Sequence, residues 1–145
     1  MRTLILFTAL AAGLMLAATA AAAGTPSRST VTVHGSRYGS ILLDGKRFAL
    51  YAFTKDGKGR SNCSGACAKA WPPYIVSGRA RASAGIRATL LGTTKRADGR
   101  LQATYAGRPL YYYVGDRQPG QVLCQNVTEF GGVWLVVRAD GTLVR

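Results

Sequence analysis

Few side chains in this sequence could perform catalytic chemistry. The 145 residues include six Asp and Glu, one His and three Cys. A Cys or Ser nucleophile needs a neighbouring base, but the single histidine, His34, lies near the expected start of the mature chain. A glycosidase needs a pair of carboxylates, and the acids that turns do not explain are Asp56, Asp116 and Glu129. Asp56 and Asp116 each follow an aromatic run, where a carboxylate can accept backbone N–H groups of the next loop. We therefore predict that the protein is not an enzyme.

The three cysteines, Cys63, Cys67 and Cys124, could form a disulfide or bind a metal. Residues at i and i+4 of a helix have Cβ atoms about 5–6 Å apart, whereas a disulfide requires about 3.5–4.5 Å. A Cys63–Cys67 bridge therefore needs a non-helical loop, which Gly65 would permit. A Cys67–Cys124 bridge would close a longer loop and stabilise more, by about 4 kcal/mol. The spacing alone leaves both pairings open.

A metal centre would have to use these same thiols. Three thiolates and His34 would satisfy the tetrahedral ligand count of structural zinc. The sequence has no Cys-x2-Cys knuckle, however, and His34 is distant from the thiols along the chain. Copper(I) or another soft metal is a similar alternative, and the haem attachment pattern Cys-x-x-Cys-His is absent. We expect no metal and no cofactor.

The N-terminus has the order of a secretory signal peptide. One positive charge precedes the apolar segment Leu4–Ala23, which ends in Ala-x-Ala at Ala21 and Ala23. We expect cleavage after residue 23, followed by a flexible lead-in over 24–35. An uncleaved membrane anchor is the alternative, because this segment is long enough to span a bilayer. No Cys precedes Cys63, so we expect a secreted or envelope protein without a lipid anchor, and no other segment is apolar enough to cross a membrane.

Charge is the strongest compositional signal. The chain carries 19 Lys and Arg against six acids, a net charge of +13. Such a surface attracts anionic partners, and in an exported protein those would be anionic envelope polymers or lipids; specific nucleic-acid binding is not expected. A solvated basic face without a partner is the alternative. The candidate residues for polyanion binding lie between the two motifs described next, with Asp98 as the one nearby acid: Arg79, Arg81, Arg87, Lys95, Arg96 and Arg100.

An internal repeat organises the chain. Leu-Tyr-x-aromatic-x-x-Asp occurs at 50–56 and again at 110–116, sixty positions later, and each copy is followed by a tryptophan. Alternation along an extended strand places Tyr51 and Phe53 on one face, and likewise Tyr111 and Tyr113. Plain packing of these aromatics is the favoured interpretation, and a ligand platform is the alternative. The motif residues to which we assign structural roles are Tyr51, Phe53, Asp56, Trp71, Tyr111, Tyr113, Asp116 and Trp134.

Elements that would position these residues are mostly strands. Asp-Gly at 44–45, 98–99 and 140–141 separates β-rich runs, which predicts hairpins closed by type I′ turns. One short helix is expected within 64–71, capped by Asn62 or Ser64 and stopped by the Pro-Pro pair that follows. We predict a mainly β fold in which two similar β-hairpin repeats, about 36–77 and 88–145, pack as a small sandwich or barrel. Together they form a single domain over 36–145.

These motifs carry a resemblance to a known family. The two Tyr-x4-Asp copies, the block 61–73 (SNCSGACAKAWPP) and the terminal Gly-Gly-Val-Trp at 131–134 resemble a bacterial family of secreted repeats with a Tyr-x4-Asp motif. Many of its members are described as predicted lipoproteins of unknown function. The resemblance implies an envelope or secreted location and a mainly β repeat, and it supplies no catalytic residues.

The resemblance also bears on the cysteines and on function. It places Cys63 and Cys67 in one block, so we expect these two to pair, which leaves Cys124 buried as a free thiol or paired between chains. We expect an exported β-repeat module that binds or scaffolds in the envelope, with affinity for anionic surface polymers. The alternative is an exported thiol-redox or metal-handling protein that uses Cys63, Cys67 and Cys124.

Overall fold

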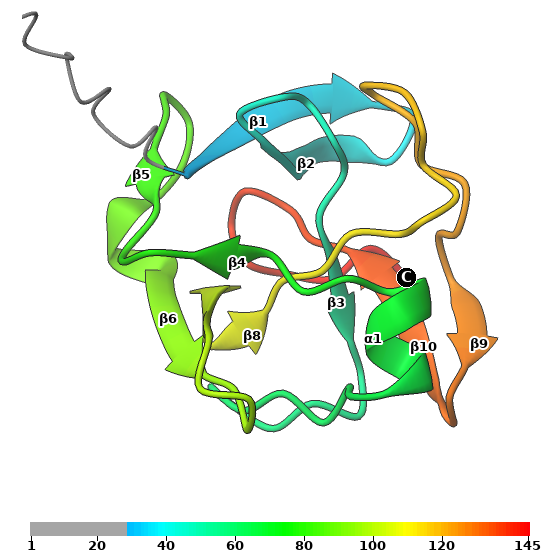
Figure 1. The fold of residues 1–145 in the computed structure, drawn as a ribbon. Coiled ribbons are helices and arrows are strands. Elements are labelled where there is room, and N and C mark those ends of the chain that lie inside the picture. The colour runs from blue at the N-terminus through cyan, green and yellow to red at the C-terminus, as the bar shows by residue number, and fades with distance from the viewer. Residues whose placement is uncertain (1–28) are drawn as a thin grey trace, which may run out of the picture.

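The computed structural model describes residues 29–145, in which strands dominate and one short helix occurs (Figure 1). The expected signal peptide at 1–23 and the first part of the expected lead-in, 24–28, lie outside the described residues. The elements in chain order are β1 (Thr30–Ser36), β2 (Gly39–Asp44), β3 (Tyr51–Phe53), α1 (Ala66–Ala70), β4 (Ile75–Val76), β5 (Arg81–Ala82), a 3-10 turn (Ala88–Leu90), β6 (Leu91–Lys95), β7 (Leu101–Tyr105), β8 (Arg108–Pro109), β9 (Val127–Glu129) and β10 (Gly132–Val136).

The strands form three small sheets that do not close into a barrel. Their orders are β2-β1-β5, β3-β10-β9 and β4-β7-β6, with β8 added beside β7. Sequence-distant segments meet in the second sheet, where β3 of the first repeat pairs antiparallel with β10 of the second, Tyr51 opposite Val136. The mainly β class with two repeats and a short helix is therefore confirmed, and the repeats are interleaved.

The expected flexible lead-in was wrong for residues 30–35. This segment forms most of β1, which pairs antiparallel with β2 and parallel with β5. Val31 is fully buried in the core, and Val33 packs against it. Alternating Val and Thr give this segment a strand pattern, so the domain begins before residue 36.

The three Asp-Gly hairpins form, but not with the predicted type I′ turns. At 98–99 and 140–141 the loops contain one more residue: Gly99 N donates to Arg96 O and Gly141 N to Arg138 O. Only the glycine of each pair has positive φ, 83° and 90°. This is the type I turn followed by a left-handed residue. At the first hairpin Arg47, with φ of 70°, occupies that position instead of a glycine.

Two hydrophobic clusters lie on opposite faces of the segment 41–53. Odd-numbered residues such as Leu43 and Tyr51 belong to one cluster, whereas Leu42 and Leu50 belong to the other. Side chains alternate between faces in an extended chain, so the parts that are buried on both sides, 41–43 and 49–53, are apolar at every position. The second repeat follows the same rule, because Leu110 lies in one cluster and Tyr111 in the other.

The helix α1 is shorter than predicted and begins after Gly65. Gly65 is the N-cap, with φ of 55° and no side-chain cap, so neither Asn62 nor Ser64 caps the helix. Trp71 N donates to Cys67 O at the C-terminal end, and the following prolines prevent continuation. Across residues 29–145 no helix has the length and apolarity needed to span a bilayer.

Candidate functional site

The two repeats meet at Tyr51 and Tyr111, the corresponding tyrosines of the two motifs. Tyr51 N donates to Tyr111 O at 2.8 Å, and Tyr111 N donates to Tyr51 O at 2.9 Å. Both tyrosines are fully buried. Equivalent residues that exchange equivalent bonds define an approximate twofold relation between the repeats.

Each motif tyrosine bonds to the aspartate of the other motif. Tyr51 Oη donates to Asp116 Oδ2 at 2.6 Å, and Tyr111 Oη donates to Asp56 Oδ2 at 2.8 Å. The second oxygen of each carboxylate accepts a loop amide further along the chain, from Asn62 for Asp56 and from Leu123 for Asp116. The Tyr-x4-Asp motif thus connects the repeats to each other rather than closing within one.

Burial sets the electrostatics of these pairs. Desolvation is the main cause that raises the pKa of Asp56 and of Asp116, and hydrogen bonds from Asn62 and the tyrosines partly oppose it. Desolvation also raises the pKa of Tyr51 and Tyr111 far above 10.0. These phenols therefore stay protonated, which suits hydrogen-bond donation rather than acid–base catalysis.

Four aromatic rings form a stack that crosses between the repeats. Trp71 and Trp134 are parallel, with ring centroids 4.0 Å apart and an interplanar angle of 3°. Phe53 stacks on Trp134 at 4.2 Å, and Tyr113 lies against Trp71 at 4.7 Å. Both tryptophans are fully buried. The two tryptophan rings therefore fill the core, whereas Tyr113 at the end of the stack is partly exposed.

The two tryptophans differ in their polar partners. Trp71 Nε1 donates to Glu129 Oε2 at 2.8 Å, which gives the remaining unexplained acid a partner. Trp134 Nε1 is buried and has no hydrogen-bond partner among the described residues. The repeat symmetry is thus broken at the N–H groups of the two tryptophans.

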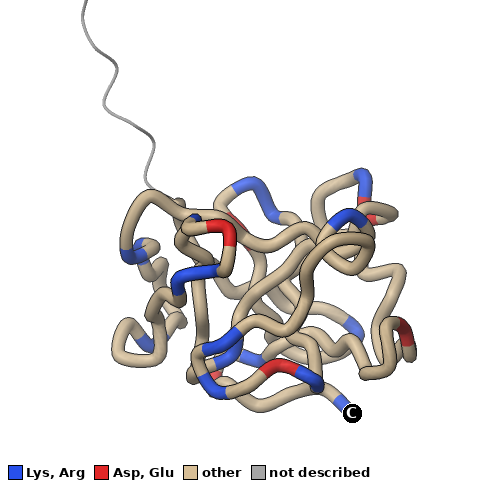
Figure 2. Tube along the Cα trace, turned by 60° about the horizontal axis from the view of Figure 1, so that its bottom comes forward, with Lys and Arg blue, Asp and Glu red and all other residues tan. Residues whose placement is uncertain are grey.

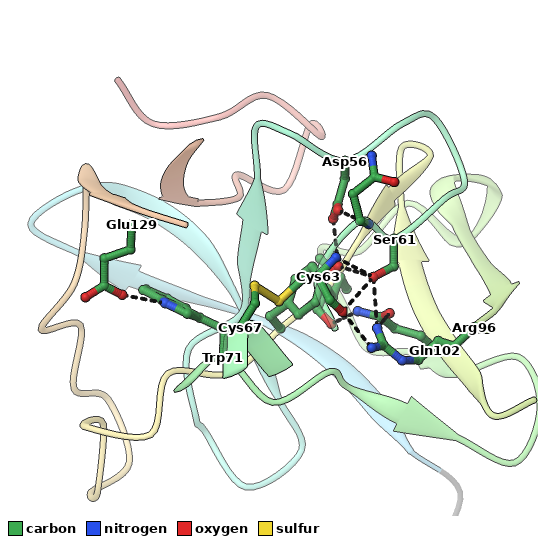
Figure 3. The surroundings of a disulfide bond; sticks show 11 residues. Asp56, Ser61, Cys63, Cys67, Trp71, Arg96, Gln102 and Glu129 are labelled. Carbon is green, nitrogen blue, oxygen red and sulfur yellow. Dashed lines mark hydrogen bonds between the residues drawn. A yellow bond between two sulfur atoms is a disulfide. The ribbon is translucent and has the colours of Figure 1, made fainter. Parts of the chain in front are cut away.

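Cys63 and Cys67 form the expected disulfide, with their Cα atoms 5.3 Å apart (Figure 3). The left-handed Gly65 lets Cys63 lie outside α1. The two cysteines are 1% and 7% exposed, so the bond is shielded from solvent. Cys124 is a partly exposed free cysteine. His34 is exposed and lies against Arg47, and residues 29–145 contain no cluster of His, Cys, Asp or Glu that could hold a metal.

Arg96 lies inside the protein, beside the disulfide (Figure 3). It is 9% exposed, and its guanidinium donates to Ser61 Oγ, Gln102 Oε1 and Cys63 O at 2.7–2.9 Å. The sequence placed Arg96 in a surface patch because a run of basic residues gives no sign of which one turns inward. This cation is engaged by the fold and is unavailable to a polymer.

The other candidate polyanion residues are exposed but do not form one patch. Arg79, Arg81 and Arg87 lie on the segment that leads into β6, whereas Lys95 and Arg100 lie at the far end of that strand. Arg100 is paired with Asp98 at 2.7 Å. The strand β6 therefore separates two basic groups.

All six acids are held by contacts within the fold. Four of them, Asp44, Asp56, Asp116 and Glu129, accept hydrogen bonds from tyrosine hydroxyls or a tryptophan N–H. Asp140 accepts from Thr142. Asp98 is the one acid within residues 29–145 that forms ion pairs. Lys and Arg are distributed along most of the chain trace, with few acids among them (Figure 2). Most of these bases are exposed and have no ion pair within residues 29–145, so most of the positive charge is uncompensated.

The repeat relation also produces two corresponding grooves. The first, named here the cationic groove, has a volume of about 230 Å³ and is lined by Phe53, Asp56, Lys58, Ala106, Gly107 and Arg108 among others. The second, the aromatic groove, has about 350 Å³ and is lined by residues that include Lys46, Phe48, Pro72, Tyr112, Tyr113 and Asp116. Each lies between the aromatic-x-x-Asp segment of one repeat and the turn before the motif of the other. Sequence reasoning missed both grooves because each needs the two repeats to be assembled.

The comparison with known proteins agrees with this two-repeat architecture. A family model described as a secreted repeat of unknown function matches the chain twice, over residues 32–74 and 92–138. Each matched segment contains one Tyr-x4-Asp motif and one tryptophan of the stack, and the first begins within β1. No curated protein and no solved structure matches the chain.

Proposed function

Because the chain belongs to a family of secreted repeats of unknown function, we propose that it is an exported binding module that attaches to anionic polymers of the cell envelope. In this proposal the signal segment is removed, and the protein is released or retained without a lipid anchor. The two repeats act as one rigid scaffold, and the ligand is attracted by the basic surface.

One observation carries this proposal: four of the six acids are committed to tyrosine or tryptophan donors, while most of the bases are exposed. Five of the six carboxylates have no ion pair within the described residues, because they accept hydrogen bonds from hydroxyl, indole and amide groups. The positive charge is therefore not neutralised by neighbouring side chains. An excess of surface charge of one sign attracts polyions of the opposite sign and accelerates their association.

The same features favour a binding role over catalysis or thiol chemistry. The carboxylates serve as acceptors for structural donors, and the motif phenols have a raised pKa. Thiol–disulfide exchange requires that an attacking thiolate reach the sulfur, and the Cys63–Cys67 bond is shielded. These contacts support a structural role for the disulfide.

Binding to anionic envelope fractions tests the proposal. The variant Arg79→Gln/Arg81→Gln/Arg87→Gln removes three exposed charges from one segment, and Lys69→Gln/Arg117→Gln/Arg145→Gln removes three exposed charges elsewhere. We expect both variants to bind less than wild type, with the larger loss in the first. Equal binding by all three proteins at low salt would contradict the proposal.

A further inference from the structure

The cationic groove holds two basic side chains that the fold leaves without partners. Lys58 and Arg108 both line this cavity of about 230 Å³. Within residues 29–145 neither side chain forms an ion pair or a hydrogen bond. Arg96 and Arg100, by contrast, are engaged by the disulfide loop and by Asp98 respectively. The groove is therefore lined by two cations that have no partner within the described residues.

Backbone contacts fix the loop that carries Lys58. Gly59 N donates to Gly107 O at 2.6 Å, and Gly59 O accepts from Thr94 Oγ1 at 2.6 Å. A Cβ built on Gly107 would come within 3.0 Å of Lys58 Cγ, and Gly107 has φ of 75°. Glycine at this turn therefore allows the aliphatic stem of Lys58 to pack directly on the backbone. The stem of Lys58 is therefore held against Gly107, the residue that precedes Arg108, by a loop that backbone contacts fix.

The corresponding groove shows that the cation pair is not a by-product of the repeat. Sixty positions from Arg108 and Lys58 stand Phe48, which lines the aromatic groove, and Gln118, which does not. The aromatic groove has one basic lining residue, Lys46, beside the carboxylates of Asp44 and Asp116. The residues that shape both grooves are kept in kind, since Phe53 corresponds to Tyr113 and Asp56 to Asp116. The two grooves thus share a framework and differ in charge.

One carboxylate also lines the cationic groove and has to be accounted for. Asp56 accepts hydrogen bonds on both oxygens, from Tyr111 and Asn62. Burial raises its pKa, and the nearby Arg96 is among the groups that lower it. Asp56 is therefore committed to the fold, and the two outer cations exceed its charge.

We propose that the cationic groove binds an oxyanion of the phosphate class, with Lys58 and Arg108 as its ligands. Guanidinium gives bidentate recognition of phosphate, and ammonium adds a compact point charge. The volume admits one phosphate with part of the group that it esterifies. This inference rests on the proposed function and localises it, since the phosphate would belong to a wall polymer or to a lipid headgroup.

The test uses phosphate probes on the mature protein labelled with ¹⁵N. Inorganic phosphate and then glycerol 3-phosphate are titrated while amide chemical shifts are followed. We expect saturating shifts concentrated at residues 57–60 and 106–108. The variant Lys58→Gln/Arg108→Gln should bind at least about tenfold more weakly, whereas Lys69→Gln/Arg117→Gln, which loses the same charge at exposed positions, should bind nearly as wild type does. Shifts that are spread evenly, or equal losses in both variants, would overturn the proposal.

A second set of measurements distinguishes a wall polymer from a lipid headgroup as the source of the phosphate. It also separates a failure of the groove from a failure of the proposed function. Polyglycerol phosphate and vesicles containing phosphatidylglycerol are compared as ligands for the same variants. Loss of binding to either one in Lys58→Gln/Arg108→Gln supports the groove and identifies the source. If wild type binds these ligands and the two double variants do so equally, the groove is refuted and the proposed function stands. If small phosphates bind in the groove but neither polymer nor vesicle binds, the proposed function fails alone.

Discussion

Tyr51 and Asp116 are 65 positions apart in the chain, yet the tyrosine hydroxyl donates to the aspartate carboxylate at 2.6 Å. The reciprocal bond, from Tyr111 to Asp56, completes a crossed pair. Neither repeat can satisfy its own motif, because the acceptor for each tyrosine comes from the other repeat. The motif therefore holds the two repeats together, and removing one tyrosine or aspartate of the motif affects both halves of the domain.

Loss of a motif carboxylate should destabilise the fold. Asp116→Ala leaves the buried Tyr51 hydroxyl and a loop amide without their acceptor, so we expect a loss of about 1–3 kcal/mol in the free energy of unfolding. Asp56→Ala should behave similarly. Urea denaturation measures both, with Asp140→Ala as the control because that carboxylate only supports an exposed turn. Unchanged stability in both motif variants, together with loss of polymer binding, would instead make these carboxylates ligand-binding groups.

Stability should depend on the protonation of Asp56 and Asp116. Burial raises the pKa of each above 3.8, so the folded state binds these protons more tightly than the unfolded chain. Their contribution to the free energy of unfolding therefore increases as the pH falls through the raised pKa, and the gain is complete below 3.8. Asp98 and Asp140 have a lowered pKa, caused mainly by Arg100 and Thr142 respectively, and oppose this trend weakly because they are exposed.

Thermal melts between about pH 7 and pH 4 examine this dependence. Wild type is compared with Asp56→Asn/Asp116→Asn, which lacks both ionisations. We expect the Tm of wild type to increase relative to the Tm of the variant as the pH falls. Parallel Tm curves for the two proteins would show that the two carboxylates titrate normally.

Arg96 should matter for folding rather than for polymer binding. Arg96→Met removes the donor shared by Ser61, Gln102 and the Cys63 carbonyl. Hydrogen bonds to a charged group contribute about 1.5–3 kcal/mol each, so we expect at least that loss of stability. Denaturation and polymer binding are measured side by side, with Lys95→Met as the exposed control. An Arg96→Met variant that is as stable as wild type but binds less polymer would show that Arg96 contacts the polymer.

The cysteines should give one inert bond and one accessible thiol. Thiol titration of unreduced, denatured protein should detect Cys124 alone. Cys63→Ser/Cys67→Ser should lower the free energy of unfolding by about 2 kcal/mol, because the bond closes only a short loop. A mixture of two disulfide isomers, or a disulfide to Cys124 found by peptide mapping, would refute this pairing.

Local patterns predicted the parts of this structure that depend on local sequence. Alternation correctly placed Tyr51 with Phe53 and Tyr111 with Tyr113 on one face, and Asp-Gly pairs located hairpins. The turn type was wrong because the hydrogen bonds that decide it begin one residue earlier. The strand at 30–36 was missed because its alternation is short and follows a polar stretch.

What sequence could not supply was the pairing between repeats. The crossed Tyr–Asp bonds, the stack of Trp71 on Trp134 and both grooves require residues about sixty positions apart to meet, and one copy carries no sign of its partner. Arg96 shows the same limit for charge. Its neighbours Lys95 and Arg100 are exposed, and only the acceptors around the disulfide loop explain why it is buried.

The salt dependence of binding is the sharpest test of attachment to anionic envelope polymers. The dissociation constant of wild type for polyglycerol phosphate is measured from about 0.1 M to about 1 M salt, over which the Debye length falls from about 10 Å to about 3 Å. We predict that affinity falls steadily with salt, and that removal of Arg79, Arg81 and Arg87 or of Lys58 and Arg108 makes this dependence shallower. Affinity that is unaffected by salt and by both sets of substitutions would contradict a role in binding anionic envelope polymers.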